Sequence, residues 1–298
     1  MTNENDFFVK YPIEYLSKYN ELFLLLYVYL HRHRSIEGYI NLTVKDFLAY
    51  YNIKQDRNKG RINNKVYDML QFMIDDGFIS FTGCYSNGGL AEVNSNSIHS
   101  DMMFTLQIIN DEKWNPENRF VKIKYSEIDI LRRNINKKIG KILLLFLNIK
   151  KRISVNGDGS SSVHIAFPSE GTLSKECSIS IRIMKEYIKK LCDCNMLYMT
   201  NYGSYKRMKN SKEIICNSNN IYALDEKFLQ SEKDVYISYL KDFYSFIDGF
   251  YSFCNNLPDK TDENNIADTS DNDYSIEQIL DMVETSTVNE NDYDNVWD

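Results

Sequence analysis

The feature that most constrains the fold of this chain is an order of predicted helices and strands that occurs twice. Each copy has a long apolar helix, a short strand, a brief helix, a tight turn, a second long helix and a two-stranded hairpin. The first copy is predicted over helices at 21–34, 44–51 and 60–76 and strands at 39–42, 78–82 and 102–109. The second copy is predicted over helices at 137–152, 172–177 and 181–194 and strands at 163–167, 196–199 and 221–224. This is the order of a winged helix-turn-helix unit, and its repetition predicts two such units in tandem.

Capping residues and apolar stripes support these assignments. Asn20, Thr43 and Ser126 stand where helix caps are expected, because their side chains accept hydrogen bonds from free backbone N–H groups. Apolar residues recur at helical spacing in the second long helix of each copy and are predicted to be buried: Ile62, Val66, Met69, Leu70 and Met73, then Ile181, Met184, Ile188 and Leu191. With only 12 Gly and 4 Pro in 298 residues, helices are favoured over a many-stranded barrel. We therefore expect a fold that is mainly α with small β-hairpins (α+β).

Four consecutive parts are expected along the chain. Residues 1–112 form a first winged-helix domain and residues 113–225 a second. Residues 226–255 form an aromatic-rich helix or a pair of helices, and residues 256–298 have the composition of a disordered tail. The stripe of the aromatic-rich part either packs against the second unit or forms a homodimer interface, and it contains Tyr236, Leu240, Phe243, Ile247, Phe250 and Cys254.

The charge is distributed unevenly, and this decides which partners are plausible. The whole chain has a net charge of −7. Residues 256–298 contain 13 acidic residues and 1 basic residue, a net charge of −12, which leaves +5 for the remainder. A mildly basic folded body with an acidic tail is compatible with nucleic-acid binding, although the whole chain is acidic.

Cysteine usage and hydropathy predict the compartment. The six cysteines form no regular framework, which is typical of a reduced, cytoplasmic protein. The first six residues are polar and acidic and do not read as a signal peptide. The longest apolar runs, 22–30 and 142–147, are too short to span a bilayer. We expect a soluble cytoplasmic protein with no membrane association.

The second helix of each turn motif supplies the candidate DNA contacts. In a winged helix this element enters the major groove, where Arg reads guanine, Asn reads adenine, and Lys and Ser mostly hold phosphates. The candidates in the first unit are Arg57, Lys59, Arg61, Asn64 and Lys65, and those in the second are Ser180, Arg182, Lys185, Lys189 and Lys190. A helix face that contacts only solvent carries similar charges. Because these basic residues accompany the turn motif in both copies, we favour contact with DNA.

The two hairpin loops differ in charge. The second, a polar loop predicted over 200–218, is basic and adds five candidates that reach the DNA backbone or minor groove: Tyr205, Lys206, Arg207, Lys209 and Lys212. The first, over 84–101, has no basic residue and two acidic ones, Glu92 and Asp101. We expect the second unit to bind DNA more strongly and the first to be partly a protein-contact module.

Residue patterns for catalysis are weak. His31 and His33 flank Arg32 in the last turn of a predicted helix, where a cationic histidine suits the helix dipole, and no third metal ligand is evident. No Gly-rich phosphate loop followed by Lys and Ser or Thr occurs, so ATP hydrolysis is not expected. We expect no enzymatic activity, no catalytic residue, no metal and no cofactor.

Apolar residues interrupt the acidic tail at two places. Ile276, Ile279, Leu280 and Val283 fit an amphipathic helix, and Trp297 lies near the end. One interpretation is a plain solubilising tail. The others are a peptide that docks on a helicase or helicase loader, and a segment that competes with DNA for the protein's own basic face.

Three segments carry a family resemblance over about residues 7–225. They are "FFVKYPIEYLSKYNELFLLLYVYLHRH", "LTVKDFLAYYNI" with "YDMLQFMIDDGFI", and "TLSKECSISIRIMKEYIKKLCDCNML". The arrangement resembles the tandem winged-helix replication initiators of plasmids, phages and integrative elements from low-GC Gram-positive bacteria. The resemblance implies binding to repeated origin sites in double-stranded DNA, local duplex opening and recruitment of a helicase or its loader. The acidic loop of the first unit differs from the pattern expected if both units bound DNA in the same way.

Three functions stay open at this point. The first is a sequence-specific replication initiator, and the second is a transcription regulator with the same DNA chemistry. The third is an interaction adaptor whose winged helices bind proteins, which the acidic loop of the first unit permits.

Overall fold

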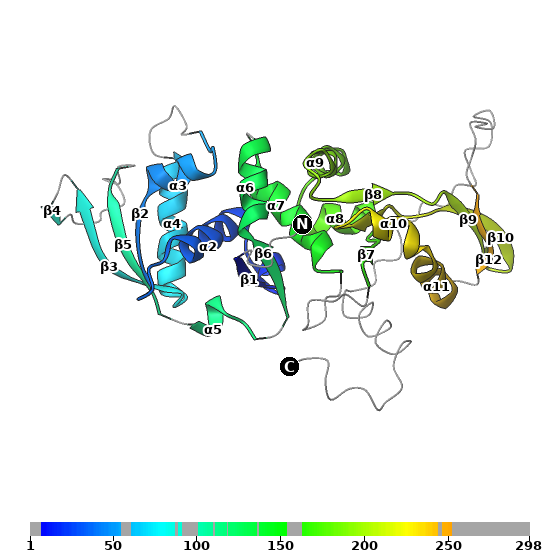
Figure 1. Cartoon of the computed structure of the whole chain (residues 1–298), viewed down its shortest axis with the longest axis horizontal. Coiled ribbons are helices and arrows are strands. Elements are labelled where there is room, and N and C mark those ends of the chain that lie inside the picture. Colours follow the sequence, from blue (N-terminus) through cyan, green and yellow to red (C-terminus); the bar gives the residue numbers. More distant parts are fainter. Residues whose placement is uncertain are drawn as a thin grey trace. The chain divides into compact units, whose positions relative to one another are not determined.

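The computed structural model describes residues 7–54, 61–86, 89–90, 101–109, 111–117, 119–135, 137–153, 163–243 and 246–251. Contacts divide the chain into two compact units, residues 1–147 and 148–298 (Figure 1). Both units combine helices with small antiparallel sheets, which confirms the α+β class. The division falls after Leu147, whereas the sequence places a domain boundary after residue 112. The acidic tail and its apolar islands lie outside the described residues.

The first unit is built around a helix, α2 (Glu21–His33), that is apolar almost throughout. Eight consecutive residues, Phe23 to Leu30, are buried. The helix begins at Asn20, whose side-chain oxygen accepts hydrogen bonds from the backbone N–H groups of Leu22 and Phe23 at 3.0 and 3.1 Å, as predicted. A helix buried all round over eight residues has to be covered on every side, and the remaining elements of the unit provide that cover.

One part of this cover is a pair of helices with a four-stranded sheet. Thr43 caps α3 as predicted, because its hydroxyl accepts a hydrogen bond from the Asp46 N–H at 3.0 Å. The strands pair in the order β2-β5-β3-β4, so β5 lies between β2 and β3. β3 continues beyond the predicted end at residue 82 because it pairs with β5 as far as Tyr85 and with β4 at Tyr85 and Ser86. These elements are β2 (Tyr39–Thr43), α3 (Val44–Tyr50), α4 (Arg61–Asp75), β3 (Ile79–Ser86), β4 (Gly89–Leu90) and β5 (Met103–Ile108).

A second part of the cover explains why residues after 112 belong to the first unit. β1 pairs antiparallel with β6, and α6 follows β6 directly. The backbone N–H of Lys124 donates to Glu127 Oε2 at 2.9 Å, so α6 begins at Tyr125 and the prediction that Ser126 caps it is wrong. The elements of this part are β1 (Phe8–Pro12), α1 (Tyr15–Lys18), α5 (Asp111–Trp114), β6 (Phe120–Lys124) and α6 (Tyr125–Asn134).

An ion-pair cluster fastens α6 to α2 and α3. Arg32 donates two hydrogen bonds to the carboxylate of Asp129, at 2.8 and 3.0 Å. Arg132 also bonds to Asp129, at 3.3 Å, and its guanidinium lies 3.6 Å from the centre of the Tyr50 ring. Burial raises the pKa of Asp129, but the hydrogen bonds and charges of Arg32 and Arg132 outweigh it, so the pKa is lowered overall.

Residues 139–223 repeat the main order of helices and strands seen in residues 21–108, and the boundary between the two units after Leu147 falls within the first helix of this copy. That helix is α7 (Ile139–Lys150), and the strands pair in the order β7-β11-β8, so the last strand again lies in the middle. At the end of α7, Lys151 and Arg152 both bond to Glu176 of α8, at 3.2 and 2.9 Å. The elements are β7 (Ile165–Ala166), α8 (Glu170–Cys177), α9 (Ile181–Asp193), β8 (Tyr198–Thr200) and β11 (Ile221–Ala223).

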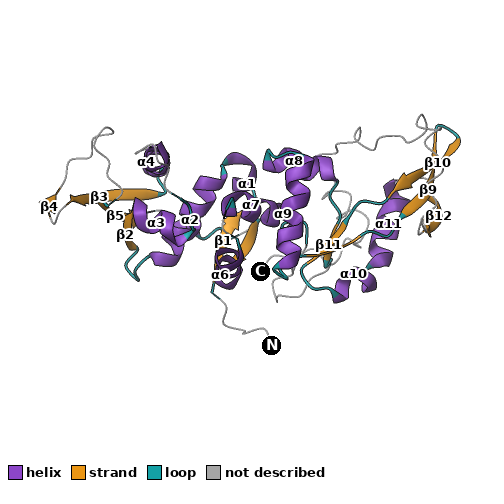
Figure 2. Cartoon of the chain, turned by 90° about the horizontal axis from the view of Figure 1, so that it is seen from above, coloured by secondary structure: helices purple, strands orange, loops and turns teal. Residues whose placement is uncertain are grey.

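The segment predicted as a polar loop over 200–218 is a β-ribbon instead (Figure 2). β9 (Ser204–Lys209) and β10 (Lys212–Asn217) pair along their whole length, and β12 (Phe246–Tyr251) pairs with the other edge of β9. Asn210 and Ser211 join β9 to β10 with φ of 50° and 62°. Positive φ at both central residues matches the twist of a tight hairpin, so the polar residues of this segment form strands and not an open loop.

The aromatic-rich part after residue 225 is not one continuous helical segment. It contains α10 (Lys227–Ser231), α11 (Lys233–Phe243) and the strand β12, so the helix prediction is wrong for residues 246–251. Tyr236 and Leu240 of α11 are buried in one cluster with Tyr205 and Ile221, which is the core packing that one of the two sequence interpretations predicts. No helix in the described ranges is long and apolar enough to cross a membrane.

The first prediction concerns the pH dependence of the first unit. His31 Nδ1 lies 3.0 Å from the Tyr125 hydroxyl, and burial together with the charge of Arg34 lowers the pKa of His31 to about 4. The unfolded chain, with a His pKa of about 6.5, therefore binds the proton more readily, so stability is complete above about pH 6.5 and falls towards pH 4. Urea unfolding at pH 7 and pH 5 should show about 2 kcal/mol more loss for the wild type than for His31→Gln. Equal losses in the two proteins would contradict the burial of a neutral His31.

The second prediction tests whether α11 belongs to the core of the second unit. Leu240 is 1% exposed, so Leu240→Ala should lower the free energy of unfolding by about 2–5 kcal/mol through lost burial and a new cavity. Ser238 lies on the exposed side of the same helix, and Ser238→Ala should change stability by less than about 0.5 kcal/mol. Chemical denaturation of both variants measures the difference. Similar small effects would show that α11 does not stabilise the unit.

Candidate nucleic-acid interface

The turn between α8 and α9 sets the direction of α9. Ser178 ends α8 in the left-handed conformation, with φ of 50°, and its N–H bonds back to the last turn of the helix. Ser180 then begins α9, because its hydroxyl accepts a hydrogen bond from the Ile183 N–H at 3.4 Å. The predicted turn over residues 178–180 is thus confirmed, and Ser180, a candidate DNA contact, is exposed and serves as the helix cap.

One face of α9 packs into the unit. Met184, Ile188 and Leu191 are buried as predicted, and Tyr187 is buried beside them. The prediction that Ile181 is buried is wrong, because 43% of this residue is exposed. Ile181 is the first residue of the helix and precedes the point at which the apolar stripe enters the core.

The opposite face of α9 is exposed and basic. Arg182, Lys185, Lys189 and Lys190, all candidate contacts, are exposed to solvent. Positions 182, 185 and 189 lie on one line of the helix surface, since residues three or four apart are neighbours. The structure therefore brings together, on one helix face, every candidate from α9 that the sequence singles out.

Two carboxylates accompany this basic face, and the sequence reasoning did not single them out. Lys185 Nζ lies 2.9 Å from Glu170 Oε2, and Arg182 NH1 lies 3.2 Å from Glu186 Oε1. Glu170 also accepts a hydrogen bond from Asn220 at 3.3 Å. The side chains of Arg182, Glu186 and Lys185 are largely exposed and that of Glu170 is partly exposed, so each pair is weak and can exchange its carboxylate for another anion. The pair of Arg182 and Glu186 could have been predicted from its i, i+4 spacing, whereas the contact of Glu170 with Lys185 depends on the fold.

The β9–β10 ribbon presents a second set of cations. Lys209 and Lys212 flank the two-residue turn and are directly opposite each other in the strand register. Both are exposed, while Lys206 and Arg207 are partly covered further down the ribbon. Arg207 Nε lies 3.2 Å from Cys216 Sγ across the two strands.

Tyr205 is the candidate that the structure moves away from the surface. It is only 5% exposed and belongs to the hydrophobic cluster that includes Tyr236 and Leu240. The expectation that Tyr205 reaches the DNA backbone or minor groove is corrected, because alternate side chains of a strand point to opposite faces and this one points into the core.

The corresponding helix of the first unit, α4, is less basic in its described part. Asn64 and Lys65 are exposed as expected, but Asp68 is exposed between them and the following turn. Arg61 is the first residue of α4. Arg57 and Lys59 lie outside the described residues.

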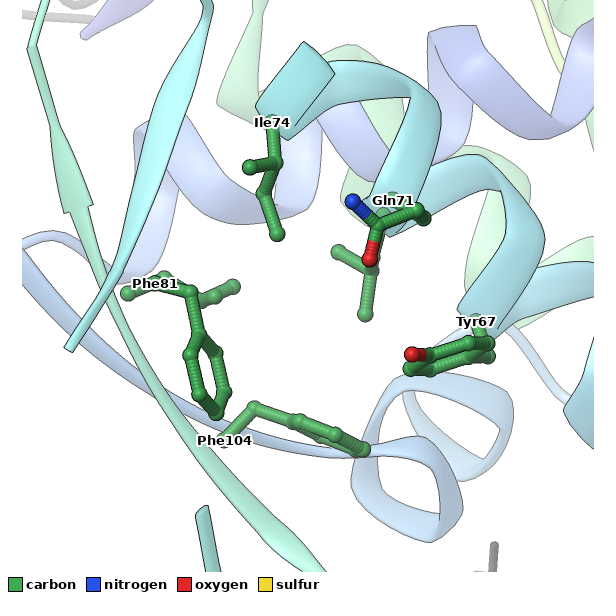
Figure 3. Close-up of a pocket in the computed structure, with 7 residues that line it drawn as sticks. Tyr67, Gln71, Ile74, Phe81 and Phe104 are labelled. Carbon is green, nitrogen blue, oxygen red and sulfur yellow. The ribbon is translucent and has the colours of Figure 1, made fainter. Parts of the chain in front are cut away.

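Beside α4 the first unit has an apolar pocket rather than a basic surface (Figure 3). Its volume is about 250 Å³, and it opens between α4 and strands β3 and β5. In Figure 3, Gln71 and Ile74 from α4 point towards the ring of Phe81 on β3. The lining residues are Tyr67, Leu70, Gln71, Ile74, Phe81, Phe104 and Leu106.

The paired histidines that raise a metal-site question have other neighbours. His31 Nδ1 lies beside the Tyr125 hydroxyl, and His33 Nδ1 donates to the Tyr29 carbonyl oxygen at 2.8 Å. Among the residues that the structure describes, no group of three or more His, Cys, Asp or Glu side chains is arranged to hold a metal ion.

No protein-family model matches this chain, and no curated protein matches it in sequence. The resemblance to replication initiators therefore stays a prediction from the sequence pattern.

Proposed function

We propose that this chain is a non-enzymatic, sequence-specific binder of double-stranded DNA, built from two winged helix-turn-helix units in tandem. The observation that carries the proposal is the exposed basic face of α9, which follows a capped turn and stands in the same unit as a ribbon with lysines at its tip. In a winged helix these two elements are the recognition helix and the wing.

The repeated topology supports the winged-helix assignment. Apart from β4 in the first copy and the β9–β10 ribbon in the second, residues 21–108 and 139–223 both have the order helix, strand, helix, helix, strand, strand. In both, the three principal strands pair so that the last strand lies between the first and the second, as β2-β5-β3 and β7-β11-β8. A short antiparallel sheet of this order places its hairpin next to the second helix of the turn motif.

The chemistry of the exposed side chains fits DNA better than a solvated helix. Arg182 has the planar donors that bind guanine edges, and Lys185 and Lys189 supply compact charges for phosphates. The weak carboxylate partners of Arg182 and Lys185 are anions that a phosphate or a base edge replaces upon binding. Lys209 and Lys212 at the ribbon tip extend the charged surface beyond the helix.

Within this class, the resemblance of residues 7–225 favours a replication initiator that binds origin repeats and recruits the host replication machinery. The acidic tail then docks on a helicase or helicase loader through Ile276, Ile279, Leu280, Val283 and Trp297. A transcription regulator would use the same DNA chemistry. Maintenance of a plasmid that depends on the candidate origin separates these two roles.

A second function for the first unit is favoured by one observation. The pocket beside α4 is lined mainly by apolar and aromatic side chains, and Phe81 at its edge is 43% exposed. An apolar surface of this kind is more typical of a protein contact than of DNA binding. We therefore propose that the second unit provides most of the DNA affinity and that the first unit also contacts protein.

The third prediction tests the basic face of α9 by charge reversal. Arg182→Glu with Lys185→Glu should reduce affinity for duplex DNA by at least about 100-fold, because two phosphate or base contacts become repulsive. The control is Lys124→Glu with Lys241→Glu, which has the same net charge but changes exposed lysines on β6 and α11. Fluorescence anisotropy with a labelled random-sequence duplex measures both. Equal losses in the two double variants would contradict a specific role for α9.

The fourth prediction concerns the carboxylate that holds Lys185. Glu170→Gln removes the negative charge 2.9 Å from Lys185 Nζ and should raise affinity for random-sequence duplex about two- to five-fold. Asp225→Asn is the control: it changes charge equally, removes the partner of Lys227 on another part of the unit and should have a smaller effect. A gain of the same size in both variants would mean that only the net charge matters.

A further inference from the structure

Ile181 is an apolar residue on a helix face whose other side chains are charged. On the face of α9 that points to solvent, the side chains at 182, 185, 186, 189 and 190 are all charged. Ile181 is the only exposed large apolar residue of this helix, with 43% of it accessible to solvent. One exposed isoleucine is ordinary on a protein surface, so the position of this residue carries the argument and its exposure alone does not.

The local structure fixes Ile181 at the start of the basic face. The left-handed residue Ser178 and the cap Ser180 place it in the first turn of α9, directly before Arg182. Met184 is the first residue of the helix to be buried, so the helix enters the core one turn later. Ile181 is therefore held in a defined place beside exposed cations, and 43% of it is exposed to solvent.

We propose that Ile181 determines sequence specificity by packing against the 5-methyl group of a thymine in the major groove. This inference rests on the proposed function and deepens it. In helix-turn-helix proteins the first residues of the recognition helix meet the base edges, and the thymine methyl is the apolar feature that the major groove offers. The charges around Ile181 favour DNA over an apolar partner at this surface, because Arg182, Lys185 and Lys189 attract a phosphate backbone.

The division of labour between neighbouring side chains follows from their chemistry. Arg182 and the lysines attract any duplex, since phosphates are present at every step. An isoleucine gains nothing from a phosphate, but it buries a methyl group when thymine lies opposite. Burial of one methyl group corresponds to about a four-fold change in an equilibrium constant. Ile181 thus adds discrimination to a surface whose affinity is mainly electrostatic.

The test uses uracil, which differs from thymine only by the absence of the 5-methyl group. The full-length wild-type chain first selects its preferred duplex from a random pool, and each thymine of that duplex is then replaced singly by deoxyuridine. We expect one replacement to weaken wild-type binding about four-fold. Ile181→Ala should bind the thymine duplex about as weakly as the wild type binds that uracil duplex, and should not distinguish the two. Ile181→Val, which keeps a branched apolar side chain, should retain part of the discrimination.

The outcomes separate this inference from the function on which it rests. If Ile181→Ala discriminates thymine from uracil as the wild type does, or if no replacement weakens wild-type binding, the role of Ile181 is overturned while DNA binding stands. If the wild type binds no duplex even at low salt, the proposed function fails and the role of Ile181 fails with it. Unchanged thermal unfolding of Ile181→Ala shows that any loss reflects the contact itself, as expected for a residue that is 43% exposed.

Discussion

The candidate site depends on the burial of one face of α9. Met184, Ile188 and Leu191 cannot leave the core without exposing apolar surface, and each such side chain contributes about 1.5–3 kcal/mol when fully buried. Because the helix is rigid, fixing these three residues also fixes the opposite face, where Arg182 and Lys189 project into solvent. The same packing also fixes the binding surface of the helix. The buried residues do not contact a partner themselves, but they hold the charged residues of α9 in one line.

The rest of the second unit stabilises this arrangement. The capped turn at Ser178 and Ser180 sets where α9 begins, and the bonds from Lys151 and Arg152 to Glu176 hold α8 against the end of α7. α11 places Tyr236 and Leu240 under the β9–β10 ribbon, in the cluster that also buries Tyr205. A ribbon with a packed base and an exposed tip suits a wing, because its lysines are displayed on a defined support instead of a freely moving loop.

Much of this could be predicted from the sequence, and the failures have physical causes. The helix caps Asn20 and Thr43 and the burial of Met184, Ile188 and Leu191 were predicted correctly because they depend on local spacing. The sequence predicts a loop where the ribbon forms because its residues are polar, and it is the pairing of β9 with β10 and β12 that makes them strands. Tyr205 and Ile181 were each predicted on the wrong side of the surface for a related reason, because burial depends on the neighbours that the fold brings. Residues of α11 share a buried cluster with Tyr205, whereas Ile181 precedes the point at which α9 enters the core. The contact of Glu170 with Lys185 likewise required the fold.

The most direct test of DNA binding by this surface is the salt dependence of affinity of the whole chain for a random-sequence duplex. Each phosphate contact adds about −0.9 to the slope of log K against log salt concentration, so contacts from Arg182, Lys185, Lys189, Lys209 and Lys212 predict a slope of about −4.5. A slope of this size, reduced when these residues are neutralised, would support the account. A slope near zero, or no binding at low salt, would contradict it and would leave these units as sites for protein partners.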